Sequence, residues 1–139
     1  MKKLFLLSFL FIALISCKDQ LKEEVVQTYD NGQPASLHYV NKKNECVREV
    51  QYYENGIVKM EGGMKNDKRS GEWKSYFPDG KVQSTGFFED GIRTGEASVY
   101  HENGNIYMRG QYKKGRKNGE WIFYDEQGYE TSRKTFYVD

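Results

Sequence analysis

Three glutamates at a regular interval and a histidine are the residues of this sequence that could do catalytic chemistry. Glu72, Glu96 and Glu120 recur at one constant interval, and carboxylates that lie close together can bind a metal ion or transfer protons. If each interval is one β-hairpin, however, these carboxylates lie about 10 Å apart, which is too far for a metal pair. His101 stands where the preceding interval has Phe77, which indicates a structural ring. We therefore expect no enzyme, no cofactor, no metal and no small-molecule substrate.

The first seventeen residues indicate a different chemical event, at Cys17. Two lysines precede an apolar run from Leu4 to Ile15. This run is too short to span a bilayer as a helix, which takes about 20 residues, but it suits the core of a signal peptide. The motif LISC that ends at Cys17 resembles the bacterial lipobox, in which the cysteine thiol is lipidated and becomes the mature N-terminus. The alternative is an ordinary secretory signal in which Cys17 is incidental.

Lipidation at Cys17 would divide the chain into three parts. These are a signal peptide over residues 1–16, the lipidated cysteine with a tether over 17–27, and a repeat domain over 28–139. Several acyl chains on one cysteine would anchor the protein stably, since each buried CH₂ contributes about 0.8 kcal/mol. Lys18 and Asp19 resemble the signal that sends some Bacteroidetes lipoproteins to the cell surface. We expect a protein anchored by lipid to a membrane of the bacterial cell envelope, the outer membrane and, on this signal, the cell surface.

The segment from residue 28 to 139 repeats with a period of 24 residues. Turn glycines recur at this period at Gly56, Gly80, Gly104 and Gly128, and a tyrosine precedes each by four positions, at Tyr52, Tyr76, Tyr100 and Tyr124. The two tryptophans, Trp73 and Trp121, are two periods apart. Tyrosine and β-branched residues between glycine turns are typical of β-hairpins, and a fixed period indicates a repeat protein. The predicted fold is all-β, an elongated antiparallel meander of about five 24-residue hairpins, largely in one layer.

The turn of each unit predicts how its strands pair. Between Tyr76 and Val82, Pro78 and Asp79 suit the central positions of a turn, and Gly80 suits the left-handed position that follows. This is a three-residue loop with a glycine bulge, and it places Tyr76 opposite Val82.

The same register assigns side chains to the two faces of the sheet. Tyr76 then shares a face with Gly86, whose missing side chain leaves room for an aromatic ring, and Trp73 points to the other face. A two-residue loop would exchange Trp73 for Tyr76 on this face.

The repeat itself resembles a known family. The pattern G-E-W-x-x-Y-x-x-x-G-x-V, followed by G-x-Y or G-x-F and a second glycine loop, resembles the MORN-variant repeat from about Val47 to Phe136. Bacterial lipoproteins with such repeats resemble the YwqK family, whose members are described as antitoxin or immunity partners of toxins. The resemblance implies a scaffold that binds proteins or lipid without catalytic residues, and it implies a toxin as the partner. The first and last units depart from the pattern at Pro34, His38, Glu49, Glu130 and Lys134.

The distribution of charge favours a protein or lipid partner over nucleic acid. Removing Lys2 and Lys3 with the leader leaves 19 basic against 20 acidic residues, a net charge of −1, whereas nucleic-acid binding takes a basic footprint. A meander places its tight turns along one margin and its return loops along the other. The tight turns are acidic. The return loops carry eight basic residues, diluted by Asp67, Glu89 and Asp90: Lys65, Lys68, Arg69, Arg93, Lys113, Lys114, Arg116 and Lys117. This is either solvated loop charge or an oriented surface for an acidic protein or anionic headgroups.

The C-terminal part of the chain contains the candidate binding surface. It comprises the basic loop Lys113, Lys114, Arg116 and Lys117 and the closing strand residues Thr135, Phe136 and Tyr137. No further repeat covers that strand, and an open strand edge can pair with another chain. The leading interpretation is a membrane-anchored, non-catalytic protein-binding module. The alternative is an envelope structural element or a surface that rests on anionic lipid.

Cys46 is the one cysteine left if Cys17 is lipidated, so no intrachain disulfide can form. It stands where later units have Ser70, Thr94 and Asn118, which indicates a loop position. Cys46 is then either a tolerated free thiol or a link to another chain.

Overall fold

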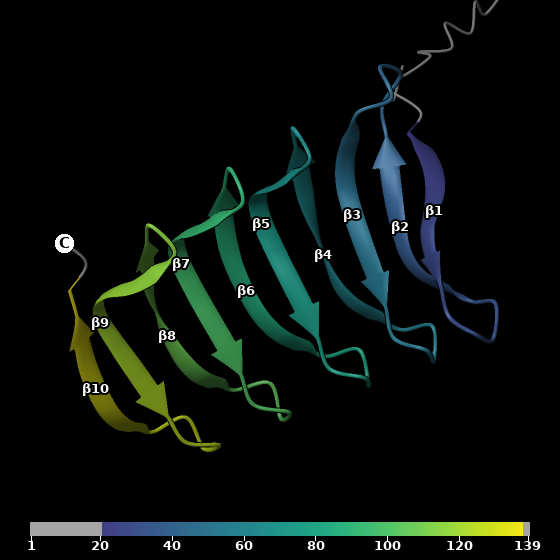
Figure 1. Cartoon of the computed structure of the whole chain (residues 1–139). Helices are drawn as coiled ribbons and strands as arrows, with labels where there is room; N and C mark the ends of the chain where they lie inside the picture. Colours follow the sequence, from purple (N-terminus) through teal and green to yellow (C-terminus); the bar gives the residue numbers. More distant parts are fainter. Residues whose placement is uncertain (1–20, 138–139) are drawn as a thin grey trace, which may run out of the picture.

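The computed structural model describes residues 21–137, which form one antiparallel sheet of ten strands (Figure 1). The strands pair in chain order from β1 at one edge to β10 at the other. They are β1 Lys22–Thr28, β2 Pro34–Val40, β3 Cys46–Tyr52, β4 Val58–Lys65, β5 Lys68–Tyr76, β6 Val82–Glu89, β7 Ile92–Tyr100, β8 Ile106–Lys113, β9 Arg116–Tyr124 and β10 Glu130–Phe136. The predicted all-β hairpin meander is confirmed. The predicted signal peptide (1–16) and lipidation site Cys17 lie outside the described residues.

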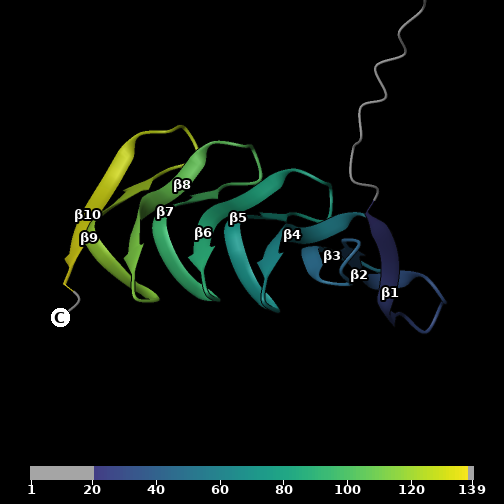
Figure 2. The same cartoon turned by 90° about the horizontal axis from the view of Figure 1, so that it is seen from above.

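The sheet is an elongated, curved ribbon with two different margins (Figures 1 and 2). The hairpin-turn margin carries the loops 29–33, 53–57, 77–81, 101–105 and 125–129. The return-turn margin carries the connections 41–45, 66–67, 90–91 and 114–115. Because consecutive strands simply alternate in direction, every loop of one kind lies on the same side of the ribbon.

The hairpin turns have the predicted geometry. Phe77 N–H donates to the carbonyl of Lys81, and Gly80 N–H donates to the carbonyl of Phe77, both at 2.8 Å. Gly80 has a φ of +87°, a conformation that glycine adopts without steric cost. The same pair of bonds closes the other four turns, including those of the two terminal units. The predicted pairing of Tyr76 with Val82 is confirmed.

A second irregularity beside each turn reverses the predicted assignment of faces. Ser75 pairs with Ser84 and Tyr76 with Val82, so Gln83 is an extra, bulged residue. The bulge shifts the register, and Trp73 pairs with Gly86. The prediction that Tyr76 shares the face of Gly86 was therefore wrong. Trp73 occupies that face (the tryptophan face), and Tyr76 lies on the opposite one (the tyrosine face), where its hydroxyl donates to Glu61.

The return turns between β4 and β9 are tight two-residue turns. Asn66 and Asp67 have φ values of 51° and 58°, which is the signature of a type I′ hairpin turn. The strands therefore begin sooner after these turns than predicted, and Ser70, Thr94 and Asn118 lie in strands rather than loops. Cys46, which follows the longer connection 41–45, is likewise in a strand, as the first residue of β3. Cys46 is only 8% exposed, and its thiol lies 3.4 Å from the Arg48 carbonyl. Burial is the main cause that raises the pKa of this thiol.

The N-terminal end of the ribbon starts inside the segment predicted as a tether. Residues 22–27 belong to β1, and Glu24 pairs with His38 of β2. The most deeply buried residue of this end is Val50, 2% exposed, which pairs with Leu37 and Glu61 and therefore lies on the tyrosine face. Glu49 occupies the position that Trp73 has in the next unit, so this unit is buried differently.

The core of the central units consists of indole rings laid on glycines. Trp73 and Trp121 are 4% and 0% exposed. Trp73 lies over Gly62 and donates its indole N–H to the Gly63 carbonyl at 2.9 Å. Trp121 lies over Gly110 and donates to a carbonyl of β8 at 3.1 Å. Burying a ring against backbone lets one layer of sheet form a core without a second layer.

Two glycine-to-alanine substitutions can distinguish the packing of the indole ring on a glycine from the general effect of replacing a glycine within a strand. A Cβ on Gly110 would lie 2.4 Å from the Trp121 ring, whereas a Cβ on Gly86 would meet only Ala97, at 3.7 Å. We expect Gly110→Ala to lower the free energy of unfolding by about 1–3 kcal/mol through overpacking. The matched variant Gly86→Ala should be neutral or slightly stabilising. Urea unfolding measures both, and equal losses for the two variants would contradict the packing role of the indole.

Candidate binding surface

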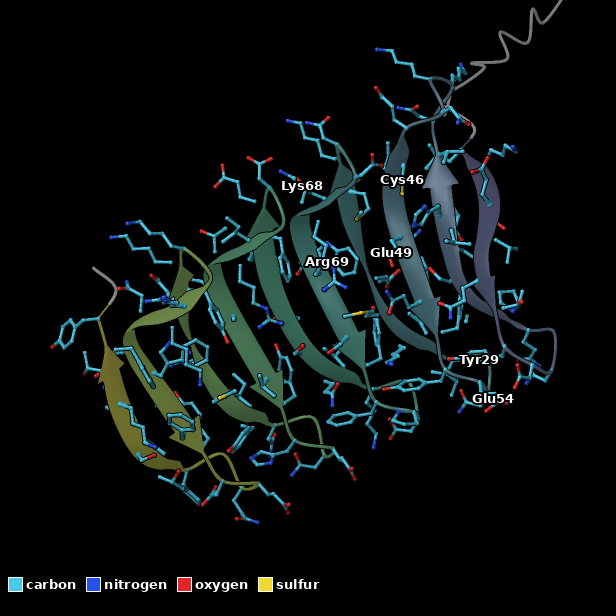
Figure 3. All side chains as sticks on the ribbon, in the orientation of Figure 1. Tyr29, Cys46, Glu49, Glu54, Lys68 and Arg69 are labelled. Atoms are coloured by element: carbon cyan, nitrogen blue, oxygen red, sulfur yellow. The ribbon has the colours of Figure 1, made fainter. Side chains whose placement is uncertain are left out.

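The basic residues predicted to share a loop surface divide into two groups. Lys113, Lys114 and Arg116 lie at the β8–β9 return turn, where Lys113 pairs with Arg116. Lys117, in contrast, turns onto the tryptophan face, with its ammonium 4.3 Å from the centre of the Trp121 ring. Figure 3 shows the same division two units earlier in the chain, with Lys68 near the return-turn margin and Arg69 further in over the sheet. The prediction of one basic loop was therefore wrong for Lys117.

A row of cations stacked on aromatic rings (the stacked row) runs along the tryptophan face. Arg69 lies 4.1 Å from the ring centre of Trp73 and 5.6 Å from that of Phe88. Arg93 lies 5.4 Å from Phe88 and 5.2 Å from Tyr112. Phe88 is thus shared by two successive arginines. Each exposed contact of this type contributes about 0.5–1 kcal/mol, so the row couples one repeat to the next.

The row ends at the C-terminal edge of the sheet. Lys117 also lies 5.5 Å from the ring centre of Phe136, and burial followed by the charge of Lys134 lowers the pKa of Lys117. Two predicted residues, Lys117 and Phe136, are therefore brought together. Thr135 pairs with Glu120 in β10, and Tyr137, just beyond the strand, is 88% exposed. β10 is an edge strand, as predicted.

The hairpin-turn margin is held together by bonds that cross from one unit to the next. The hydroxyl of Tyr29 donates to the carbonyl of Tyr52 at 2.6 Å, and that of Tyr53 donates to Tyr76 at 2.8 Å. His101 takes the same role with its ring Nε2–H, 3.1 Å from the Tyr124 carbonyl. His101 therefore has a structural position in the described part of the chain, immediately after β7.

The tyrosine face carries a charged network around Glu61. Tyr76 donates its hydroxyl to Glu61 Oε1 at 2.6 Å, and Arg48 forms an ion pair with the other oxygen. Burial raises the pKa of Glu61, but the hydrogen bonds from Tyr76 and Arg48 outweigh it, so the net pKa is lowered. Burial and the bond to Glu61 raise the pKa of Tyr76 to about 12. The ionised carboxylate is thus the form that the fold stabilises.

Between residues 21 and 137, no group of three His, Cys, Asp or Glu side chains is placed to hold a metal ion. The same part of the chain has no helix long and apolar enough to cross a membrane.

Comparison with known protein families agrees with this geometry. Residues 47–66, 69–90 and 93–114 match the MORN repeat variant. Three consecutive units of the ribbon thus match this repeat. Each matched segment covers most of two strands and the hairpin turn between them. The unmatched ends, around Gly32 and Gly128, have the same turn geometry as the matched units between them. No curated protein matches the chain.

The stacked row is the feature of this surface that sequence reasoning missed. Arg69, Arg93 and Lys117 each stand two positions before a glycine, and they recur at the period of the repeat. Those glycines, Gly71, Gly95 and Gly119, have φ values of 74°, 65° and 70° inside strands. A bulge of this kind re-aims the neighbouring side chain, so the regular spacing of the cations was the available signal.

Acid unfolding should reveal the network around Glu61. Because the folded-state pKa of this carboxyl is lowered, its stabilising contribution is present above the unfolded-state pKa of about 4.3 and is lost as the pH falls through the folded-state value. We expect Glu61→Gln to cost about 1–2 kcal/mol at pH 7 and to flatten the loss of stability below about pH 4.3. Glu72→Gln, which alters an exposed pair with Lys74, is the matched control. Parallel acid limbs for wild type and Glu61→Gln would contradict this assignment.

Proposed function

We propose that this protein is a non-catalytic protein-binding module, anchored by lipid on Cys17 to a membrane of the bacterial cell envelope. The observation that supports it best is the stacked row on the tryptophan face. Within residues 21–137 no second layer covers either face of the sheet, and Arg69, Arg93 and Lys117 are half-buried among rings. A fixed, uncovered surface of arginine and aromatic side chains has the composition of protein-interface hot spots.

Exposed apolar residues and open edges support the same proposal. Phe87, Ile92 and Tyr107 are 43%, 53% and 41% exposed. β1 and β10 are the edge strands of the described sheet, and each could accept a strand from a partner. The ribbon therefore offers a partner both side-chain and main-chain contacts.

A lipid anchor on Cys17 would also orient the ribbon. β1 runs from the return-turn margin toward the hairpin-turn margin, so Leu21 lies at the return-turn end of the strand (Figure 1). Four residues of chain reach at most about 14 Å, so the anchor would hold the N-terminal end of the return-turn margin near the membrane. Lys113 and Arg116 lie on that margin, and each lysine or arginine near an anionic surface contributes about 1 kcal/mol.

With the anchor in this position, contact between the basic return turns and anionic lipid would assist the protein-binding function and would not replace it. A surface that rests on anionic lipid needs exposed cations on the membrane side, and the return-turn margin supplies them. The stacked cations of the tryptophan face are not part of that margin and are left for a protein partner. The resemblance to the YwqK family makes a toxin the partner class that we propose.

Lipidation can be tested directly in the bacterial host. We expect the wild-type chain to incorporate an alkyne-labelled fatty acid and to fractionate with membranes, and Cys17→Ser to do neither, since the thiol forms the thioether. Cys46→Ser is the matched control and should behave as wild type. If the wild-type chain carries no label, Cys17 belongs to an ordinary secretory signal.

Partner binding can be tested by cross-linking the tagged chain in its host and identifying what is recovered. We expect one stoichiometric protein with wild type and with Lys68→Glu, which alters the return-turn margin. Arg93→Glu should weaken its capture at least about tenfold, as expected for a hot-spot arginine. Circular dichroism establishes that the variant is folded.

Two outcomes of this experiment would count against the proposal. Recovery of lipid and abundant envelope proteins alone, with no stoichiometric partner, would favour an envelope structural element. Equal capture by folded Arg93→Glu and wild type would show that the stacked row is not part of the interface. If the recovered partner kills cells that lack this protein, the antitoxin assignment follows.

A further inference from the structure

A hollow at the hairpin-turn margin is the feature that the proposed function leaves unused. It has a volume of about 520 Å³ and lies between the turns of the third, fourth and fifth units. Four aromatic residues line it, together with two glutamates and an asparagine: Phe77, Tyr100, His101, Tyr107, Glu102, Glu126 and Asn103. The rings of His101 and Tyr107 meet edge to face at 5.0 Å. This combination of π faces and carboxylates has the chemistry of a cation site.

One missing hydroxyl group explains why the margin is open at this place. In three other units the ring after the strand bonds the carbonyl of the next unit, from Tyr29, Tyr53 and His101. Phe77 stands at the equivalent position and has no donor. Among residues 21–137 no side chain donates to the Tyr100 carbonyl, and Tyr100 lines the hollow. A ligand with N–H groups could therefore bond an oxygen that the other units satisfy internally.

Two lysines of the earlier units stand at positions that correspond to residues beside the hollow. Lys81 donates its ammonium to the Glu102 carbonyl at 3.0 Å and pairs with Asp79. Lys59, one unit earlier, lies 5.8 Å from the ring centre of Tyr53. Both contacts show that ammonium groups fit the turns and rings of this margin.

At the hollow these internal lysines are replaced by uncharged residues. Asn105 stands where the preceding unit has Lys81, and Tyr107 stands at the bulge position that Lys59 occupies. The carboxylates of Glu102 and Glu126 form no ion pair within the described residues. The side of the hollow at Glu126 therefore has an asparagine, hydrogen-bonded to the Glu126 carbonyl at 2.7 Å, where the preceding turn places the ammonium of Lys81 at Glu102.

We propose that this hollow binds the ammonium group of a lysine side chain supplied by the partner protein. The inference rests on the proposed function for the source of the lysine, but the site itself is a property of this chain. The rings would contact the ammonium and its methylene stem, the two carboxylates would balance its charge, and the Tyr100 carbonyl would accept one N–H bond. The ligand class is an alkylammonium.

The position of the hollow agrees with this occupant. The hairpin-turn margin lies opposite the return-turn margin (Figure 1), so a lipid anchor would leave it facing away from the membrane. Asp125 belongs to a neighbouring turn and would attract a basic segment of a partner. The anionic headgroups of a membrane would be repelled by the same charge.

The test uses the full-length protein in detergent and Nα-acetyl-lysine amide as the probe. We expect saturable binding that shifts the NMR signals of His101 and Tyr107, and no saturable shift with the Nε-acetylated compound, which has no charge. Glu126→Gln and Tyr107→Leu should each weaken binding about three- to tenfold. Glu54→Gln, on a distant turn, is the matched control and should bind as wild type.

Phe77→Tyr is the decisive variant because it should preserve the fold while closing the site. Its hydroxyl can donate to the Tyr100 carbonyl as Tyr53 does to Tyr76, so we expect equal or higher thermal stability and at least about tenfold weaker lysine binding. Unchanged binding by Phe77→Tyr, or equal binding of the charged and acetylated probes, would overturn the proposal. If the lysine probe binds but no protein partner can be cross-linked, the proposed function is contradicted and the lysine site stands. If a partner is captured but the lysine probe does not bind, the lysine site is contradicted and the proposed function stands.

Discussion

The structure depends on the contact between an indole ring and a glycine of the neighbouring strand. A single-layer sheet has no second layer to cover its apolar side chains, and most short antiparallel ribbons are unstable for this reason. Trp73 and Trp121 bury their apolar surface without a second layer, because the rings lie flat on Gly62 and Gly110 and contact the backbone. Trp121 is completely buried as a result, in a protein with a mean hydropathy of only −0.84. The glycines are therefore as much a part of the core as the tryptophans.

The rest of the ribbon distributes stability between neighbouring units. Rings donate across the hairpin-turn margin from one unit to the next, and Gly91 and Gly115 donate their N–H groups to the carbonyls of Arg69 and Arg93 at the return-turn margin. The stacked row adds a third connection on the tryptophan face. Since each unit contacts only its neighbours, stability should accumulate along the chain as in other repeat proteins. The ends, which have one neighbour each, can then depart from the pattern, as Glu49 and Lys134 do.

Differences between otherwise equivalent units are where function can enter such a regular structure. Tyr53 and Phe77 differ by one hydroxyl group, so the side-chain bond that Tyr53 donates to the next unit has no counterpart at Phe77, which lines the hollow. Trp73 and Ala97 occupy equivalent positions on the tryptophan face with very different volumes. A repeat protein can thus keep one architecture and still present a different surface at each unit.

The sequence by itself determined the repeat, the class of fold, the hairpin turns and the direction of every strand, while the bulges were left to the tertiary structure. The first group follows from local chemistry: Gly80 and its equivalents allow a left-handed turn, and the constant period orders the turns along two margins. The sequence also indicated the open edge at β10 and the structural role of His101. It did not determine which face each aromatic residue occupies, the strand position of Cys46, or the start of β1 within the predicted tether.

Only the tertiary structure decided the two faces, because they depend on bulges. A bulge at Gln83 or Gly71 shifts the pairing of the strands, and a one-residue shift moves every following side chain to the other face. Neither bulge is required by the local sequence, since a regular strand satisfies the same propensities. The bulges form because they allow Trp73 to cover Gly62 and Arg69 to stack on Trp73, contacts between side chains and strands that no reading of one strand contains.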